Sequence, residues 1–188
     1  MVLWLKKQLE FVVLTMVNGT NSGMAIIENG SLIATEDFNI EKASNLKRMY
    51  QMVRSRLIYW KPDIVAIEKV NVAGSSFGGN NVVKLAEIRA MIKLACLDFD
   101  IPFIEVSPPT LKKAITGYGK ASKREVAEVL ASIYNLDADD ICKPIYYKRD
   151  NRIKTYVAEQ SDAIALAHYV YEKKYAKDYP KRKFVEVI

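Results

Sequence analysis

Cysteine and histidine are scarce in this sequence. The 188 residues include two cysteines, Cys96 and Cys142, and a single histidine. The two cysteines lack the close spacing of a metal site, and Cys96 falls within an apolar helical pattern, which predicts a buried thiol. Free thiols of this kind are typical of a reducing compartment, so we expect a cytoplasmic protein.

Long hydrophobic runs are also missing. No apolar stretch reaches the roughly 18 residues that a membrane-spanning helix needs. The apolar start of the chain is followed at once by Lys6, Lys7 and Glu10, so no signal-peptide core is formed. No repeat, low-complexity tract or linker divides the sequence. We therefore expect one domain over residues 1–188 and no membrane partner.

Acidic residues are absent between Glu10 and Glu28. Within this gap, an apolar run is broken by Asn-Gly-Thr-Asn-Ser-Gly at positions 18–23 and then resumes, a pattern that predicts two strands of a β-hairpin. The break carries two glycines and several short polar side chains, more backbone freedom than a plain turn requires. We expect something polar to approach the end of the first strand.

The remaining pattern predicts an α/β fold. Asn29-Gly30 marks a second hairpin, which gives three antiparallel strands before the first helix. Two further strands alternate with helices, as in parallel pairing through helical crossovers, so we expect a mixed five-stranded sheet flanked by helices. The expected strands cover residues 11–17, 24–28, 32–38, 63–68 and 102–106. The expected helices cover residues 43–60, 82–98, 108–115, 123–135 and 157–175. Residues 71–81 are predicted as a loop, the basic insertion at 137–156 as a loop or a small subdomain, and residues 173–188 as a basic tail.

Three carboxylates are candidates for a metal site. Glu68 ends an apolar strand, and ligands gather at the carboxyl ends of such strands. Glu159 and Asp162 lie three residues apart at the start of a helix and share a face. Each also has an ordinary explanation, because Glu68 can mark an exit to solvent and acids favour helix N-termini. That explanation suits Asp162 less well, because small apolar residues surround it. Together the three could hold two divalent ions for phosphodiester cleavage.

Six motifs in order resemble the RuvC-type Holliday-junction resolvases, which belong to the ribonuclease H-like superfamily. The similarity covers most of residues 11–172, and the motifs lie at residues 18–23, 66–70, 84–90, 106–113, 117–123 and 159–167. The length and basic balance are most like those of the small phage members. The resemblance implies a homodimeric endonuclease that resolves four-way junctions and other branched DNA with two Mg²⁺ ions, or Mn²⁺ as a substitute, and without a nucleotide cofactor. A phage origin would place it in a bacterial host cell.

This sequence has no acidic residue where that family has its first metal ligand. The resemblance implies four carboxylates, of which Glu68, Glu159 and Asp162 match three. The first is usually an Asp before a Gly-containing turn, and here the place falls on Asn18, or on Val17 by a strict count from Gly19. Asn18 keeps a neutral carbonyl acceptor and lacks the charge. An inactive or weakened form, natural or engineered, is therefore expected.

Basic residues supply candidate DNA contacts. Five cluster around a Gly-Tyr-Gly break, namely Lys112, Lys113, Lys120, Lys123 and Arg124. They suit phosphate contacts, although each alone is equally typical of a solvated helix face. The resemblance places Lys112 and Lys123 near the scissile phosphate, with Lys112 in a catalytic role. Phe77 either inserts at a branch point of the DNA or anchors its loop in the core. The basic residues of 143–154 either contact the outer arms of a branched DNA or belong to a solvated loop.

Two other functions are compatible with the sequence, and the helix expected at the dimer interface has a second possible role. A branched-DNA-binding protein that does not cleave would keep the basic surface and tolerate the missing Asp. An actin-like ATPase or sugar kinase also has a Gly-Thr turn, but it needs a second phosphate-binding hairpin and a far longer chain. The helix at 82–98 is the expected dimer element, with Met91, Leu94 and Leu97 either at an interface or in an ordinary core.

Overall fold

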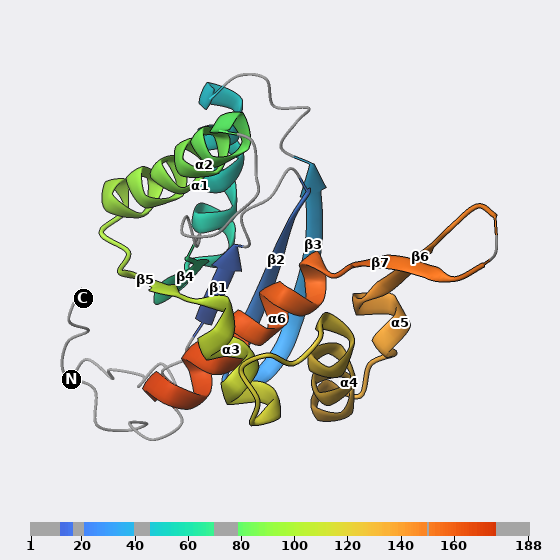
Figure 1. Ribbon diagram of the computed structural model, residues 1–188. Coiled ribbons are helices and arrows are strands. Elements are labelled where there is room, and N and C mark those ends of the chain that lie inside the picture. Colours follow the sequence, from blue (N-terminus) through green and yellow to red (C-terminus); the bar gives the residue numbers. More distant parts are fainter. Residues whose placement is uncertain (1–11, 17–20, 40–45, 70–78, 150, 176–188) are drawn as a thin grey trace, which may run out of the picture.

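The computed structural model describes residues 12–16, 21–39, 46–69, 79–149 and 151–175 (Figure 1). A five-stranded sheet lies at the centre, in the order β3-β2-β1-β4-β5. Its strands are β1 (Val12–Met16), β2 (Asn21–Glu28), β3 (Ser31–Asn39), β4 (Ile64–Glu68) and β5 (Phe103–Val106). The helices are α1 (Leu46–Trp60), α2 (Gly79–Asp98), α3 (Pro108–Thr116), α4 (Lys123–Tyr134), α5 (Ala138–Ile141) and α6 (Glu159–Val170).

Strand pairing confirms the mixed α/β sheet. The first three strands pair antiparallel, and β4 and β5 add in parallel beside β1. The Asn29-Gly30 turn has positive φ at both residues, 51° and 86°, as a tight two-residue hairpin requires. Met16, the last residue of β1, pairs with Ile67. The carboxyl ends of β1 and β4 therefore lie side by side, and Glu68 is at that edge.

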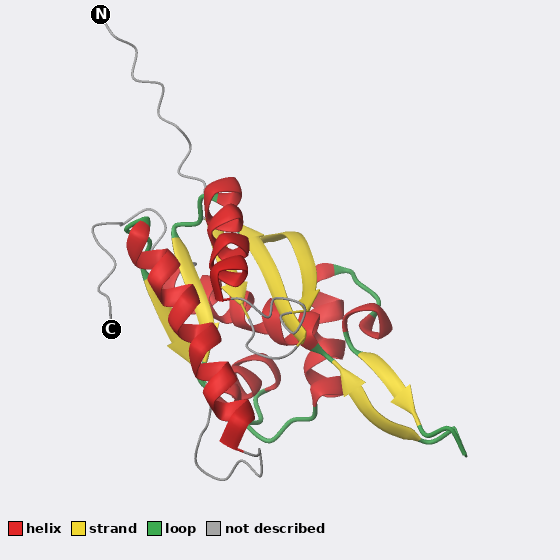
Figure 2. Ribbon diagram, turned by 90° about the horizontal axis from the view of Figure 1, so that it is seen from above, coloured by secondary structure: helices red, strands yellow, loops and turns green. Residues whose placement is uncertain are grey.

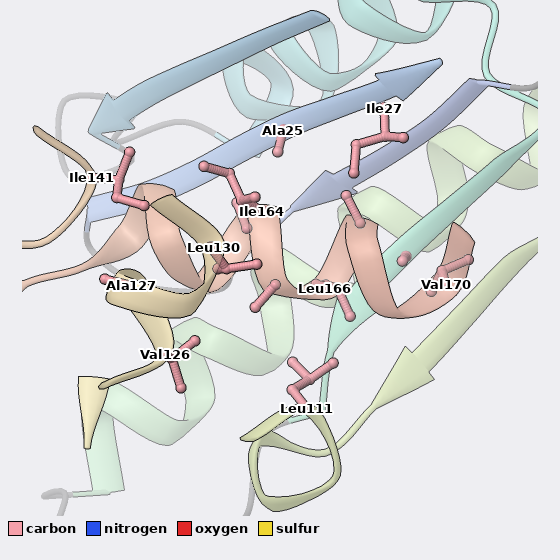
Figure 3. Packing of buried hydrophobic residues seen from close by; sticks show 14 of the residues in the cluster. Ala25, Ile27, Leu111, Val126, Ala127, Leu130, Ile141, Ile164, Leu166 and Val170 are labelled. Atoms are coloured by element: carbon pink, nitrogen blue, oxygen red, sulfur yellow. The ribbon is translucent and has the colours of Figure 1, made fainter. Parts of the chain in front are cut away.

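Alternating side chains divide the core into two layers. Met24 and Ile26 of β2 face α1 and α2, whereas Ala25 and Ile27 face α3, α4 and α6. Strand β4 alternates in the same way and is buried on both faces, which explains its continuous apolar sequence. Figure 2 shows the sheet between the two groups of helices, and Figure 3 shows side chains of β2, α3, α4 and α6 meeting in one cluster.

Helix α6 packs against the sheet at very short range. A Cβ atom added to Gly23 of β2 would stand 2.1 Å from the backbone oxygen of Glu159, so only glycine fits there. Ala163, Ala165 and Ala167 keep the rest of this helix thin, and all three are buried. The second glycine of the Asn-Gly-Thr-Asn-Ser-Gly motif thus fixes the distance between the sheet and the first turn of α6.

Several boundaries differ from the sequence prediction. Helix α2 begins at Gly79, inside the predicted loop, and the last helix begins at Glu159 and continues as a short π-helical segment over Tyr171–Tyr175. At 137–156, which the sequence predicted as a loop or a small subdomain, the chain forms α5 and a hairpin of β6 (Lys143–Tyr146) and β7 (Ile153–Val157). This ribbon is exposed on both faces, so its sequence carries no apolar alternation from which strands could be predicted.

None of the helices in the described part of the chain has both the length and the apolar character of a membrane span. Cys96 is a buried free thiol, as the sequence predicted, and Cys142 is buried as well.

Candidate active site

The site forms where β4 ends and α6 begins. Glu68 is the last residue of β4 and is only partly accessible to solvent. Glu159 and Asp162 occupy the first turn of α6, and the backbone N–H of Asp162 donates to the carbonyl of Ala158. Helix α6 has no side-chain cap at its N-terminus. The helix dipole therefore favours negative charge at this end, in addition to any role the two acids have in binding.

The pKa of Glu68 depends on burial and on the neighbouring Asp162 carboxylate. Burial and, second, the Asp162 carboxylate raise the pKa of Glu68 to about 7, against the opposing effect of Lys123 and Lys112. Burial and the nearby acid therefore favour the protonated form of Glu68 in the absence of a metal ion. A carboxyl whose pKa is raised by burial and by a nearby acid is typical of functional sites. The protein places two acids together although this raises the energy of the charged state.

Lys123 lies among these acids at the start of α4. Its ammonium Nζ donates to Asp162 Oδ2 at 3.0 Å, and 48% of its side chain is exposed. Burial lowers the pKa of Lys123, but the Asp162 carboxylate and the more distant charges of Glu159 and Glu68 outweigh it, so the pKa is raised overall. The position of the helix is set by the capping box of Ser122 and Glu125, which the sequence partly predicted through Ser122.

Glu159 carries a buried carboxylate oxygen that is unsatisfied in hydrogen bonding. Its Oε2 is buried and has no hydrogen-bond partner among the residues that the structure describes. Such an atom lowers the free energy of unfolding unless a ligand or an ion binds to it. Hard divalent cations prefer carboxylate oxygens, so the chemistry of this donor set fits Mg²⁺ or Mn²⁺. Within the described ranges, no three acidic, histidine or cysteine residues form a ready metal cluster. Mg²⁺ usually takes one or two carboxylates together with water and phosphate, so a complete protein cage is not required.

The structure brings together only part of the predicted site. Glu68, Asp162 and Lys123 interact, Glu159 and Lys112 lie close enough to act electrostatically on this group, and Lys113 and Lys120 are exposed. Asn18 and Phe77 lie outside the described residues. The guanidinium of Arg124 binds Glu128 and Asp139, so it ties α4 to α5. Its role as a DNA contact stays a prediction, and its replacement would also disturb this link.

One positioning contact was missed from the sequence. Gln160 of α6 donates through Nε2 to Asp37 Oδ2 of β3 at 2.7 Å. This bond joins residues far apart in the chain and holds the first turn of α6 across the sheet. Gln160 lies in the motif at residues 159–167, but nothing in the sequence links it to Asp37, so only the tertiary arrangement reveals the contact.

The fold and the site together define a class of protein. A mixed sheet in this strand order, with acidic residues at the end of β4 and on the helix that crosses the sheet, is a ribonuclease H-like domain. Residues 7–147 match the family model described as crossover junction endodeoxyribonuclease RuvC. The chain belongs to the RuvC family. The matched segment includes Glu68 and the basic residues around Gly117, and it ends before α6.

Individual relatives agree with this assignment. The chain is 32% identical to the crossover junction endodeoxyribonuclease RuvC of Caldicellulosiruptor saccharolyticus over 132 residues, which cover 65% of this chain and 76% of the relative. The corresponding protein of Carboxydothermus hydrogenoformans is 33% identical over 118 residues, 61% of this chain and 70% of the relative. The structure of T. thermophilus RuvC in complex with a Holliday junction substrate superposes with a TM-score of 0.65 and 20% identity, over 84% of this chain and 91% of that one, which shows a shared fold.

Proposed function

We propose that this protein is a metal-dependent endonuclease that cleaves four-way and other branched DNA junctions by phosphodiester hydrolysis. The observation that carries the proposal is the convergence of Glu68, Asp162 and Lys123 from β4, α6 and α4 in a member of a junction-endonuclease family. Two acids with an exposed cation beside them suit a phosphodiester that is bound through metal ions. A fold-level resemblance alone would not support this activity.

Metal dependence is general in the RuvC family. In this chain Glu68, Glu159 and Asp162 would hold the ions, with the Asn18 carbonyl as a neutral fourth donor. A pair of divalent ions would supply an activated water and stabilise the leaving oxygen. Before an ion binds, Glu68 has to release its carboxyl proton. Lys123 neutralises Asp162 in the free protein, and its exposed ammonium is positioned to contact a DNA phosphate.

Position 18 decides how well the site functions. Strand β1 ends at Met16, which pairs with Ile67, so the chain leaves the sheet beside Glu68. Residue 18 lies outside the described residues; the resemblance assigns the family's first carboxylate to this position, and Asn18 supplies none. We therefore propose that the protein binds Mg²⁺ weakly and cleaves slowly. A junction-binding protein that does not cleave is the second candidate, because no acid occurs between Glu10 and Glu28.

The test compares the parent protein with Asn18→Asp in junction cleavage with Mg²⁺ or Mn²⁺. The expected result is a large gain in cleavage for Asn18→Asp and nearly unchanged DNA binding for Asn18→Ala, because binding depends on basic residues. Strong cleavage by the parent would mean that three carboxylates suffice. If Asn18→Asp remained inactive, position 18 would be wrong and Val17→Asp would be tested next. Activity in neither variant would support the binding protein.

A homodimer is part of the proposal. Two-fold symmetry suits a substrate with two equivalent strands. On α2, Leu94 and Leu97 expose 45% and 64% of their surface, whereas Met91 packs against the core. Leu94 and Leu97 thus remain candidates for the dimer interface. The molecular mass of the parent in solution, measured by light scattering, checks the proposed dimer.

A further inference from the structure

The β6–β7 hairpin extends from the body of the protein as an arm (Figures 1 and 2). It forms its own two-stranded sheet and does not join the central one. Every described residue from Ile145 to Thr155 is exposed, including Tyr146 at 50% and Ile153 at 48%. A two-stranded ribbon is only marginally stable by itself in water. Apolar and aromatic side chains on such an arm therefore indicate a surface used for binding.

Both ends of the arm are anchored in the core. Cys142 precedes β6 and Ala158 follows β7, and both are completely buried in the cluster that α4 and α6 share. The Arg124–Asp139 ion pair joins α4 to α5, the helix that leads into the hairpin. Glu159 of the active site comes directly after Ala158. The arm is thus held in a fixed position relative to the catalytic carboxylates.

The chemistry of the arm suits a polyanion. Residues 143–157 contain five basic side chains and one acidic side chain. The charged ends of Arg152 and Lys154 each lie 6.0 Å from the centre of the Tyr147 ring. These three residues line a shallow hollow together with Lys148 and Arg149. Cations arranged around aromatic rings recognise phosphates and the flat faces of bases.

We propose that the hairpin is a second DNA-binding element, which holds the duplex arm that flanks the cleaved strand. Its four cations near the tip contact phosphates, and Tyr147 packs against sugar or base. The inference rests on the proposed function for the presence of branched DNA. A two-stranded ribbon has the size to enter a major groove. A protein partner is less suitable, because lysine is depleted in protein interfaces.

The decisive variant neutralises the tip with Lys148→Gln, Arg149→Gln, Arg152→Gln and Lys154→Gln. Binding to a four-way junction and to a linear duplex is measured in chelator over a series of salt concentrations. Four lost phosphate contacts should lower the affinity for both DNAs at low salt by about tenfold or more and flatten the slope of log K against log salt by roughly 3–4. Tyr147→Ala should weaken binding about tenfold at an unchanged slope.

A matched control removes four exposed basic residues from the opposite side of the sheet, with Lys47→Gln, Arg48→Gln, Arg54→Gln and Lys61→Gln on α1 and just beyond it. This variant carries the same change in net charge and should lose much less affinity. Equal losses in the two variants would show a general charge effect and overturn the inference. Unchanged binding of the tip variant would overturn it as well.

Two further readouts separate the possible explanations. A lower melting temperature of the tip variant would indicate a structural role, and a changed molecular mass in solution would indicate that the hairpin binds a second copy of the chain. Either result overturns the inference. Because binding is measured without metal, the outcome is independent of cleavage. Hairpin-dependent binding by a parent protein that never cleaves would support the arm and contradict the proposed endonuclease activity.

Discussion

At the scale of single residues, the charged form of Glu68 in the candidate active site lowers the stability of the fold. Burial and Asp162 raise the pKa of Glu68 from 4.5 to about 7. The folded protein therefore holds this proton more tightly than the unfolded chain does. Between these two pH values, folding stability contributed by Glu68 falls as the pH rises, and above pH 7 the full penalty is present. A bound divalent ion would relieve the penalty by neutralising the carboxylates.

We predict that Glu68→Gln stabilises the metal-free protein at high pH. At pH 8 in chelator, its free energy of unfolding should exceed that of the parent by roughly 1–3 kcal/mol, because each unit of pKa shift corresponds to about 1.4 kcal/mol and solvent screening reduces the sum. The gain should shrink toward zero near pH 4.5. Denaturant unfolding at several pH values measures it. Glu87→Gln, at an exposed position on α2, is the control and should show no such trend. A gain independent of pH would contradict the assigned cause.

At the scale of elements, the first turn of α6 depends on Gly23. The backbone of Glu159 approaches this glycine so closely that even a methyl group does not fit. The Gln160–Asp37 bond holds the same turn beside it, because Asp37 of β3 pairs with Gly23 in the sheet. The placement of Glu159 and Asp162 relative to Glu68 thus depends on a strand residue without any side chain.

We predict that Gly23→Ala destabilises the protein by about 3 kcal/mol or more, because the clash is with rigid backbone and β2 or α6 has to move. Cleavage by Asn18→Asp should be lost in this background as well. The matched control is Gly119→Ala, where the added Cβ would stand 3.4 Å from the Pro109 oxygen and 3.8 Å from Lys113 Cβ. That variant should stay within about 0.5 kcal/mol of the parent. Similar denaturation midpoints for the two variants would refute the packing argument.

The same elements show how far the sequence could predict this structure. The central strands carry alternating or continuous apolar runs, the Asn29-Gly30 turn specifies its hairpin, and Ser122 marks the start of α4, so these features were predicted. The β6–β7 hairpin was not, because neither of its faces is buried. Glu68 and Asp162 were predicted as candidate metal ligands from local sequence pattern and from the family resemblance. Three other features depend on tertiary contacts that no local pattern encodes. They are the effect of Asp162 on the pKa of Glu68, the ion pair of Lys123 with Asp162, and the ion pair of Arg124 with Asp139.

At the scale of the whole molecule, charge is distributed for nucleic acid. The chain carries a formal charge of +6, and the segments around Gly117 and in the hairpin are both basic. Lys112 and Lys123 lie beside the carboxylates, whereas the hairpin cations lie beyond the start of α6. Proposed DNA contacts are therefore separated along the molecule. An extended set of contacts suits a substrate with several arms better than a single straight duplex.

We predict that the parent binds a four-way junction more tightly than a linear duplex of the same total length, with an affinity that falls steeply as salt increases. Gel shifts at two salt concentrations measure both effects. Lys112→Ala with Lys120→Ala should weaken binding to both DNAs and leave the melting temperature nearly unchanged, because neither side chain is part of the buried core. Arg124→Ala is the contrasting variant, since loss of its ion pairs with Glu128 and Asp139 should lower the melting temperature. Equal affinity of the parent for junction and duplex would refute structure selectivity even if cleavage were observed.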